Sequence, residues 1–382
     1  MRIAFYAPMK PPNHPTPSGD RRMARMLIAA LRKAGHRVEL ASRFRSYHGN
    51  GDPAGQRRLK ALGNRLADRL VGKYQGLPAS RRPGAWFTYH LYHKAPDWLG
   101  PAVSGALGIP YVLAEASHAP KQENGPWAIG YAASEKAIRG ANLVFGLNPA
   151  DRECVKPLLG GGGRIVALKP FIDAAPYLAA AAGRARHHRE IAGRFGLEDG
   201  VPWLLAVAMM RQGDKLESYR LLGRALGGLL DRPWRLLVAG AGPARGQVEA
   251  ALEGLGGRVS RLDATAGDLP ALYAASDIFV WPAVNEAFGM AFIEAQAAGL
   301  AVVAGNAGGV PAVVGDGESG ILAAVGDAQA FASAVARLLD DGALRERMGR
   351  AAQKRVRTEH DLGPAARLIG ETLKELAKGP GT

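Results

Sequence analysis

The sequence contains a single cysteine, and its apolar runs are short. Cys154 has no second cysteine with which to form an internal disulfide, so nothing indicates an oxidising compartment. The residues around it predict a helix on which Cys154 is packed or idle rather than a nucleophile. No apolar run reaches the roughly 18 residues of a membrane-spanning helix, and the longest, near 201–210, is interrupted by Pro202. The N-terminal segment MRIAFYAPMKPP is too short for a signal peptide and favours a strand, so we expect a cytoplasmic protein.

Metal ligands and cofactor fingerprints are also scarce. No cluster of histidine and cysteine offers a metal site. The segment VAGAGPARG places Gly240 and Gly242 as a dinucleotide-binding fingerprint does, but Arg245 occupies the position of the third glycine, and no acidic residue follows at the usual ribose position. We therefore interpret this segment as a tight turn, and we expect neither a metal nor a bound cofactor.

Positive charge is abundant and unevenly distributed. The net charge is +15, yet residues 1–172 hold 26 Lys+Arg against 10 Asp+Glu (+16), and residues 173–382 hold 23 against 24 (−1). We expect the first half to meet an anion such as a phospholipid head group or a lipid-linked phosphate; the alternative is a solvated basic surface. Nucleic acid is not an expected partner, because the basic half lacks interleaved aromatic residues and a recognition helix.

One segment concentrates this charge. The stretch QRRLKALGNRLADRLVGK, residues 56–73, carries six cations on the faces that its leucines do not occupy. The leucines form one helical stripe: Leu59, Leu62, Leu66 and Leu70. The pattern indicates a basic amphipathic helix, either a segment that lies on a membrane surface or an ordinary surface helix whose leucines pack on the domain.

The chain is too long for one ordinary core, and its strands and helices alternate twice. In the first half, strands are expected at 2–8, 36–42, 85–93, 110–118 and 142–148, with a helix over 20–34, and the segment 164–173 is expected to lead out of the domain. The second half repeats the pattern, with strands at 203–210, 234–240, 277–283 and 300–305, and helices at 214–230, 268–276 and 329–360. Such alternation predicts an α/β fold with two doubly wound, Rossmann-like parallel sheets. We place the domains at 1–172 and 173–360, followed by a C-terminal helix at 361–382.

The most informative motif is NEAFGMAFIEAQAAG, residues 285–299. It places Glu286 and Glu294 eight positions apart, after a strand that Pro282 ends because proline cannot donate to a ladder. Gly289 lets the backbone approach a ligand closely, and good helix formers follow. The first amides of that helix are expected to be free and partly positive, which suits a diphosphate.

This motif resembles the Glu-x7-Glu signature of the retaining glycosyltransferases of family 4, which use nucleotide sugars. The following text, AVVAGNAGGVPAVVGDGESGIL, looks like that family's next strand, glycine-rich loop and hairpin. The resemblance covers most of the chain and is densest from Trp203 to Met348. It implies the GT-B fold, in which two Rossmann-like domains face a cleft between the carboxyl ends of their sheets, and in which the last helix, here 362–378, crosses back onto the first domain.

The resemblance also implies roles for the motif. Glu294 would bind the ribose hydroxyls of the nucleotide, and Glu286 would bind the donor sugar near its anomeric carbon. Backbone amides of four consecutive residues would hold the diphosphate: Ala287, Phe288, Gly289 and Met290. The glutamates could instead be a glycosidase-like pair, but such carboxyls lie roughly 5–9 Å apart, whereas eight helical residues span about 12 Å. Gripping two parts of one extended ligand therefore suits the spacing better.

A cationic clamp for the leaving diphosphate is expected after the strand that opens the second domain. Family members carry an arginine there and, six residues later, a lysine. Lys215 fits the lysine, but Met209 occupies the arginine position, and the nearest arginine is Arg211. Both cations are candidates for leaving-group stabilisation, and the alternative is a pair of surface cations at a helix start.

In the first domain the resemblance singles out a glycine and a histidine. Gly19 follows a proline-rich loop and precedes a helix, where a family glycine approaches the donor phosphate or the acceptor; the alternative is a plain helix cap. Three nearby arginines add positive charge: Arg21, Arg22 and Arg25. His118 ends the fourth strand, near the position of a family histidine that lies close to the sugar or acceptor, and His90 and His93 are its rivals.

The expected function is that of a retaining, metal-independent hexosyltransferase, which moves a sugar from a nucleotide-diphosphate donor, UDP in preference to GDP, to an acceptor hydroxyl. The second domain would bind the nucleotide sugar and the first a glycan or lipid-linked acceptor, in polysaccharide or envelope synthesis at the inner face of a membrane. The alternatives are the same chemistry on a small soluble acceptor, or a catalytically silent binder of sugar nucleotides or polyanions. Met209, and Ala312 where relatives often have glutamate, leave room for the silent binder.

Overall fold

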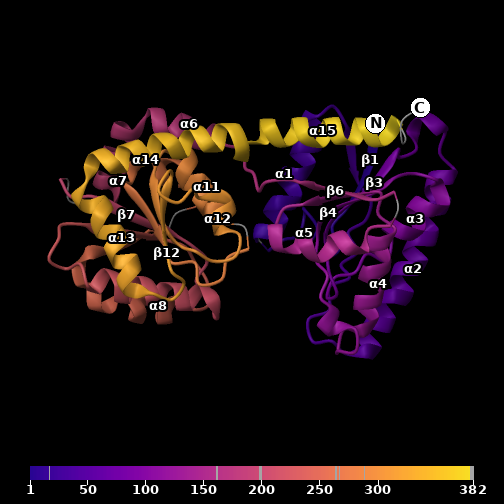
Figure 1. Ribbon diagram of the computed structural model, residues 1–382, viewed down its shortest axis with the longest axis horizontal. Helices are drawn as coiled ribbons and strands as arrows, with labels where there is room; N and C mark the ends of the chain where they lie inside the picture. The colour runs from indigo at the N-terminus through magenta and orange to yellow at the C-terminus, as the bar shows by residue number, and fades with distance from the viewer. Residues whose placement is uncertain are drawn as a thin grey trace. The chain divides into compact units, whose positions relative to one another are not determined.

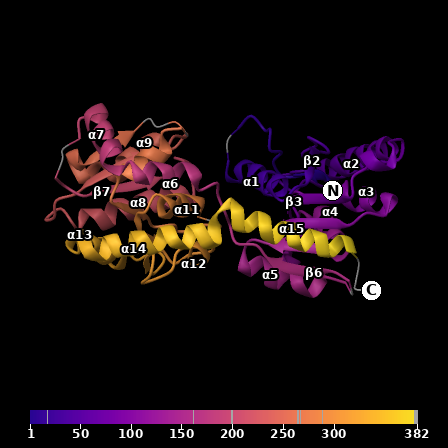
Figure 2. The same ribbon diagram turned by 90° about the horizontal axis from the view of Figure 1, so that it is seen from above.

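The computed structural model describes residues 1–16, 18–160, 162–197, 200–262, 265, 267–287 and 289–378. The chain divides into two compact units (Figure 1). Unit 1 comprises Met1–Lys169 together with the segment from Leu362 onward, and unit 2 comprises Pro170–Asp361. The sequence had placed these boundaries at 172/173 and 360/361. In each unit, helices cover a central sheet (Figure 2).

The sheet of unit 1 has six parallel strands in the order β2-β1-β3-β4-β5-β6. Their bounds are β1 Arg2–Tyr6, β2 Arg37–Leu40, β3 Ala85–Leu91, β4 Tyr111–Ala116, β5 Leu143–Gly146 and β6 Arg164–Ala167. The first five were predicted, and each ends before its predicted end, whereas β6 lies in the segment that was expected to lead out of the domain. The chain places β2 on one side of β1 and β3 on the other, so the direction of winding reverses between β1 and β3.

Some helices of unit 1 begin after a residue whose side chain caps them. In α1 (Gly19–Lys33), Ser18 accepts a hydrogen bond from the Arg21 amide, and Asp52 caps α2 (Pro53–Gln75) in the same way. The remaining helices are α3 Gly100–Leu107, α4 Ala128–Arg139, α5 Pro149–Val155 and α15 Leu362–Lys378. The last of these packs on α1 and is tied to β6 by an ion pair between Arg164 and Glu375.

Helix α2 does not bury the stripe that the leucine pattern predicted. Apart from Tyr74, the buried positions are those of small or polar residues, among them Gln56, Gly63 and Ala67. Gly63 is required because a Cβ there would lie 2.4 Å from the Cβ of Trp98. The leucines flank this contact, and Leu62 is 39% exposed. Close packing through small residues therefore leaves part of the leucine stripe at the surface beside the cations.

Unit 2 contains a second six-stranded parallel sheet, in the order β12-β11-β10-β7-β8-β9. Its strands are β7 Trp203–Val207, β8 Arg235–Ala239, β9 Val259–Leu262, β10 Ile278–Trp281, β11 Ala301–Gly305 and β12 Gly320–Ala323. The expected hairpin after the glycine-rich loop is wrong, because β12 pairs with β11 in parallel. Here the winding reverses between β7 and β10.

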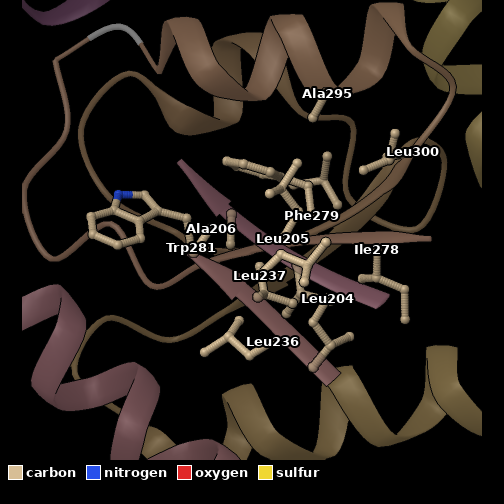
Figure 3. Close-up of a cluster of buried hydrophobic side chains, with 14 of the residues drawn as sticks. Leu204, Leu205, Ala206, Leu236, Leu237, Ile278, Phe279, Trp281, Ala295 and Leu300 are labelled. Carbon is tan, nitrogen blue, oxygen red and sulfur yellow. The ribbon is translucent and has the colours of Figure 1, made fainter. Parts of the chain in front are cut away.

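The helices of unit 2 surround this sheet. They are α6 Ala175–Ala182, α7 Arg184–Phe195, α8 Asp214–Gly227, α9 Arg245–Leu252, α10 Leu269–Ala275, α11 Met290–Ala297, α12 Val310–Val313, α13 Ala328–Asp340 and α14 Gly342–Arg355. Side chains of β7, β8 and β10 form a buried apolar cluster at the centre of the unit (Figure 3). Trp281 lies in this cluster at the carboxyl end of β10, where its ring packs edge-on against Tyr219 of α8.

Candidate active site

A lysine and a glutamate meet at the winding reversal of unit 2. Lys215 lies in the first turn of α8, after β7, and Glu286 lies in the loop after β10. Their Nζ and Oε2 atoms are 2.5 Å apart, and the side chains are 15% and 20% exposed. Lys215 Nζ also lies 5.4 Å from the centre of the Trp281 ring. In doubly wound sheets, ligands bind at the carboxyl ends of the strands where the winding reverses.

The loop that carries Glu286 is fastened to the start of α8. The Val284 amide donates to Ser218 Oγ at 3.2 Å, and the Asn285 side-chain amide donates to Asp214 Oδ2 at 3.1 Å. Ala283 adopts a φ of 50°, which is uncommon for a residue with a Cβ. These contacts hold the segment before Glu286 against the part of α8 that carries Lys215.

The glycine-rich loop that the sequence singled out supports the same segment from the other side. The Gly309 amide donates to the Glu286 carbonyl at 2.9 Å. A Cβ on Gly308, whose φ is +53°, would lie 2.2 Å from that carbonyl oxygen, and a Cβ on Gly305 would lie 1.9 Å from the Pro282 oxygen. Glycine is therefore needed at both positions so that the two loops can approach.

Helix α11 begins directly beyond this loop. Gly289 precedes it in the left-handed conformation, with a φ of +65°, and no side chain caps the helix. The first amides of an α-helix have no partner within the helix, which makes such an end attractive to anions. Of the predicted diphosphate ligands, Ala287 is exposed, Gly289 is buried and Met290 is half-buried, whereas Phe288 lies outside the described residues.

Glu294 is inside the unit rather than on the outer face of its helix. It is 2% exposed, and its Oε2 accepts a hydrogen bond from the Tyr273 hydroxyl at 2.9 Å. The alternative of a solvent-facing helix glutamate is therefore excluded. A buried carboxylate needs hydrogen-bond donors that stabilise its charge. Glu294 is therefore a candidate to accept hydrogen bonds from a ligand as well as from Tyr273.

The structure separates the two candidate cations. Lys215 reaches Glu286, whereas Arg211 is exposed and its side chain makes no hydrogen bond or ion pair with the described part of the chain. Met209, which occupies the family's arginine position, is 41% exposed. Of the two, only Lys215 is brought to Glu286.

The glycines of the dinucleotide-like segment have a structural explanation. A Cβ on Gly240 would lie 1.9 Å from the Ala208 oxygen, and one on Gly242 would lie 2.1 Å from the Met210 oxygen. They allow the loops after β7 and β8 to lie side by side. A hydrogen bond from the Met210 amide to the Ala241 carbonyl joins these loops. Their spacing follows from this loop contact.

In unit 1, the predicted glycine and arginines belong to the proline-rich loop and its helix. Gly19 is the first residue of α1, and a Cβ there would meet no atom within 4 Å, so packing does not require glycine. Arg21 donates to the carbonyls of His14 and Pro15, and Arg25 donates to that of Pro12. These two arginines therefore hold the loop.

His118 follows β4 and lies against α4. Its Nε2 is 3.0 Å from the Tyr131 hydroxyl, and the two rings are 5.2 Å apart. Burial lowers the pKa of His118, which favours the neutral ring. Among the described residues, no carboxylate bonds to either ring nitrogen.

A different histidine of unit 1 has a charged partner. His90 Nδ1 lies 2.9 Å from Asp20 Oδ1, although the residues are 70 positions apart. Glu115, on the neighbouring strand, is buried, and that burial raises its pKa to about 7. His90 was expected only as a rival of His118, and Asp20 and Glu115 were not predicted, because no local signal indicates that β3 lies between β1 and β4.

The described residues contain no group of three or more His, Cys, Asp or Glu side chains that could hold a metal ion. Within the same residues, no helix is both long and apolar enough to cross a membrane.

Two units with six-stranded parallel sheets, an uncapped helix start and a Lys–Glu pair where the second sheet reverses define a GT-B protein. A solved structure of similar architecture, Anabaena HepE in complex with UDP, superposes with a TM-score of 0.71 at 18% identity, covering 98% of this chain and 100% of that one. At this identity the likeness shows the fold alone.

The family is shown by sequence. The model of "Glycosyl transferases group 1" matches residues 207–355, which contain the whole Lys215–Glu294 site. The D-inositol 3-phosphate glycosyltransferase of Salinispora arenicola is 30% identical over 308 residues, 72% of this chain and 66% of that protein. The Corynebacterium glutamicum protein of the same name is 44% identical over 101 residues, 26% of this chain and 24% of its own. The aligned segments span less than two thirds of the first relatives. The chain belongs to the group 1 glycosyltransferases, a family of hexosyltransferase-type enzymes.

Proposed function

We propose that this protein transfers a sugar from a nucleotide-diphosphate sugar to a hydroxyl of an acceptor, with retention of the anomeric configuration. The observation that carries the proposal is the Lys215–Glu286 pair beside the uncapped start of α11, at the winding reversal of unit 2. A cation, a carboxylate and free amides at one strand edge match the phosphate and sugar parts of one donor molecule.

In this proposal the donor replaces part of the Lys215–Glu286 ion pair. Lys215 and the first amides of α11 neutralise the diphosphate, which carries more negative charge as the glycosidic C–O bond breaks. Glu286 then accepts hydrogen bonds from the sugar hydroxyls. Glu294, held by Tyr273, accepts hydrogen bonds from the ribose. The Arg211 side chain makes no hydrogen bond or ion pair within the described chain and is the second cation available to the phosphates.

The acceptor proton has a recipient that needs no metal. As the acceptor oxygen bonds to the anomeric carbon, the bond from that carbon to the phosphate oxygen breaks, and the leaving oxygen takes the proton. Attack from the leaving-group face retains the configuration. UDP is the donor nucleotide to test first, because the HepE structure is described as a complex with UDP.

Unit 1 is proposed to bind an anionic acceptor. Residues 1–172 carry a charge of +16, and the relatives are named for D-inositol 3-phosphate, a phosphorylated polyol. Helix α2 adds a half-exposed leucine edge among exposed cations, which also suits an anionic membrane carrying a lipid-linked acceptor in polysaccharide or envelope synthesis.

The donor proposal is tested by thermal shift of the protein with UDP, GDP, ADP and NAD. We expect stabilisation by UDP that is lost in Glu294→Ala and kept in Glu253→Gln, an exposed glutamate of the same unit. A shift with NAD alone would contradict the proposal. Stabilisation by a nucleotide without turnover of any sugar donor would favour a silent sugar-nucleotide binder.

Membrane binding is tested by co-sedimentation with vesicles that contain phosphatidylserine. We expect binding that falls with salt and is lost when Arg65 and Arg69 of α2 are both changed to Glu, but is kept in Arg350→Glu of α14. If the unmodified protein does not bind these vesicles, the result favours a small soluble acceptor over a membrane-bound one.

A further inference from the structure

The winding of unit 1 reverses between β1 and β3, as that of unit 2 does between β7 and β10. The carboxyl ends of β1 and β3 are therefore where a ligand of this unit is expected. Asp20, in the first turn of α1 after β1, and His90, near the end of β3, meet at this point. His118 follows β4, one strand further along the sheet, and is hydrogen-bonded to Tyr131.

The Asp20–His90 contact leaves one ring nitrogen available. Oδ1 of Asp20 lies 2.9 Å from Nδ1, so the neutral ring keeps its proton on Nδ1 and carries a lone pair on Nε2. Nε2 makes no hydrogen bond with the described residues, and it is not among the buried polar atoms that lack a partner. It therefore reaches the accessible surface of unit 1.

Backbone strain marks the same place. In the described chain the residues other than glycine with positive φ are His90 (62°), Glu115 (59°) and Ala283 (50°). Tyr89 pairs with Ala114 and Leu91 with Ala116, so His90 and Glu115 lie opposite each other on adjacent strands. Ala283 belongs to the loop that carries Glu286 in unit 2. Strained residues cluster where the surrounding structure holds functional side chains in place.

The charges around His90 come from several elements. Burial lowers its pKa, but the hydrogen bond and charge of Asp20 and the charges of Glu115 and Asp151 raise it, and the net shift is upward. Lys10, after β1, acts on Asp20 in turn. A ring surrounded by carboxylates in this way changes its protonation with pH, and only its neutral form offers the Nε2 lone pair.

We infer that His90, held by Asp20, contacts the acceptor in unit 1, with Nε2 accepting a hydrogen bond from the hydroxyl that is glycosylated. The inference rests on the proposed function and names the class of acceptor, a sugar or polyol hydroxyl. His90 orients the acceptor oxygen, and the proton still passes to the leaving phosphate. The neutral ring is the active form, so acceptor kcat/KM rises with pH through the ionisation of His90.

The test compares His90→Asn and His90→Gln with the unmodified enzyme. Asparagine tolerates a positive φ but does not reach the position of Nε2, whereas glutamine places a polar atom there. UDP release from UDP-glucose is measured with D-inositol 3-phosphate, glucose 6-phosphate and methyl α-D-glucopyranoside as acceptors. We expect His90→Asn to lower acceptor kcat/KM by about 10- to 100-fold, the range for one lost hydrogen bond, and His90→Gln to restore part of it. The donor KM stays within about twofold, because the donor ligands lie in unit 2.

Two further variants separate this role from a structural one. Asp20→Asn removes the carboxylate that raises the pKa of His90, so the rise of kcat/KM moves to lower pH. His187→Asn breaks a histidine–carboxylate pair on α7 of unit 2, where Nδ1 lies 3.2 Å from Glu190. It should change neither acceptor kcat/KM nor the pH at which kcat/KM rises. If His90→Asn fails to fold, the pH profile of Asp20→Asn decides; an unshifted profile overturns the inference.

The outcomes distinguish this inference from the proposed function. Failure of UDP to shift the melting temperature counts against the donor site alone. In that case, or if no acceptor turns over, the ¹⁵N signal of His90 Nε2, assigned with His90→Asn, is followed while each of the three acceptors is added. A moving signal supports the contact, and a signal that none of them moves overturns it. Turnover with unchanged acceptor kcat/KM in His90→Asn overturns it as well.

Discussion

Replacing Gly308 by alanine tests whether the glycine-rich loop sets the position of Glu286. The new Cβ would lie 2.2 Å from the Glu286 carbonyl oxygen and 3.2 Å from its carbon. Non-bonded heavy atoms settle near 3.5 Å, so the Glu286 backbone or the glycine loop has to move by about 1 Å. A misplacement of about 1 Å can reduce a rate by about 10²-fold. We therefore expect kcat to fall by about that factor, since Glu286 then no longer faces Lys215.

Stability should fall at the same time. Overpacking costs about 1–3 kcal/mol, and the φ of +53° adds about 1–2 kcal/mol for a residue with a Cβ. Together they predict a loss of about 2–5 kcal/mol, or roughly 4–20 °C in the melting temperature of a unit of this size.

The assay is UDP release at saturating donor, with circular dichroism for the melting temperature. Gly246→Ala is the matched control: it lies on α9 of the same unit, a Cβ there meets no atom within 4 Å, and alanine favours a helix. It should melt at an equal or higher temperature with unchanged kcat. If Gly308→Ala keeps both the wild-type kcat and the donor KM, the reasoning about this loop is refuted.

Three further predictions follow from the site and its surroundings. Lys215→Met should lower kcat by about 10²–10³-fold, because the charge proposed to stabilise the leaving diphosphate is removed; kinetics with an activated sugar donor check this, since a better leaving group should show a smaller loss. Tyr273→Phe should cost about 1–3 kcal/mol of unfolding free energy by removing the donor to buried Glu294; urea unfolding measures it, and an unchanged midpoint would argue against the contact. Glu115 has a pKa of about 7 when folded and about 4.5 when unfolded, so the folded protein binds the extra proton between these values and loses stability as pH rises through them. Glu115→Gln should flatten that slope in melting curves recorded from pH 4.5 to 8, and an identical slope would contradict the raised pKa.

Local sequence was sufficient for most of the elements and for half of the candidate site, although β9 was not predicted and β12 was expected as part of a hairpin. The predicted strands of unit 1 are present, and β3, β4 and β5 appear in the sequence as short apolar runs because they are buried along almost their whole length. Glu286, Gly289 and Glu294 could be found because they lie within nine residues of one another, around a strand end and a helix start. The packing of α2 on Trp98 could not be predicted, since the leucine stripe is the stronger pattern in the sequence. Only the close approach of Trp98 explains why Gly63 is buried instead of the leucines.

By itself, the sequence determined the α/β class, the two repeats, the glycine positions and the Glu-x7-Glu motif, since all of these depend on the local periodicity and conformational preferences of the backbone. The tertiary structure decided which distant residues meet. Lys215 and Glu286, 71 positions apart, are joined because β7 lies beside β10. Asp20 and His90, 70 positions apart, are joined because β1 lies beside β3. Strand order is set by how whole strands and helices bury their apolar faces together, and no short segment carries that information.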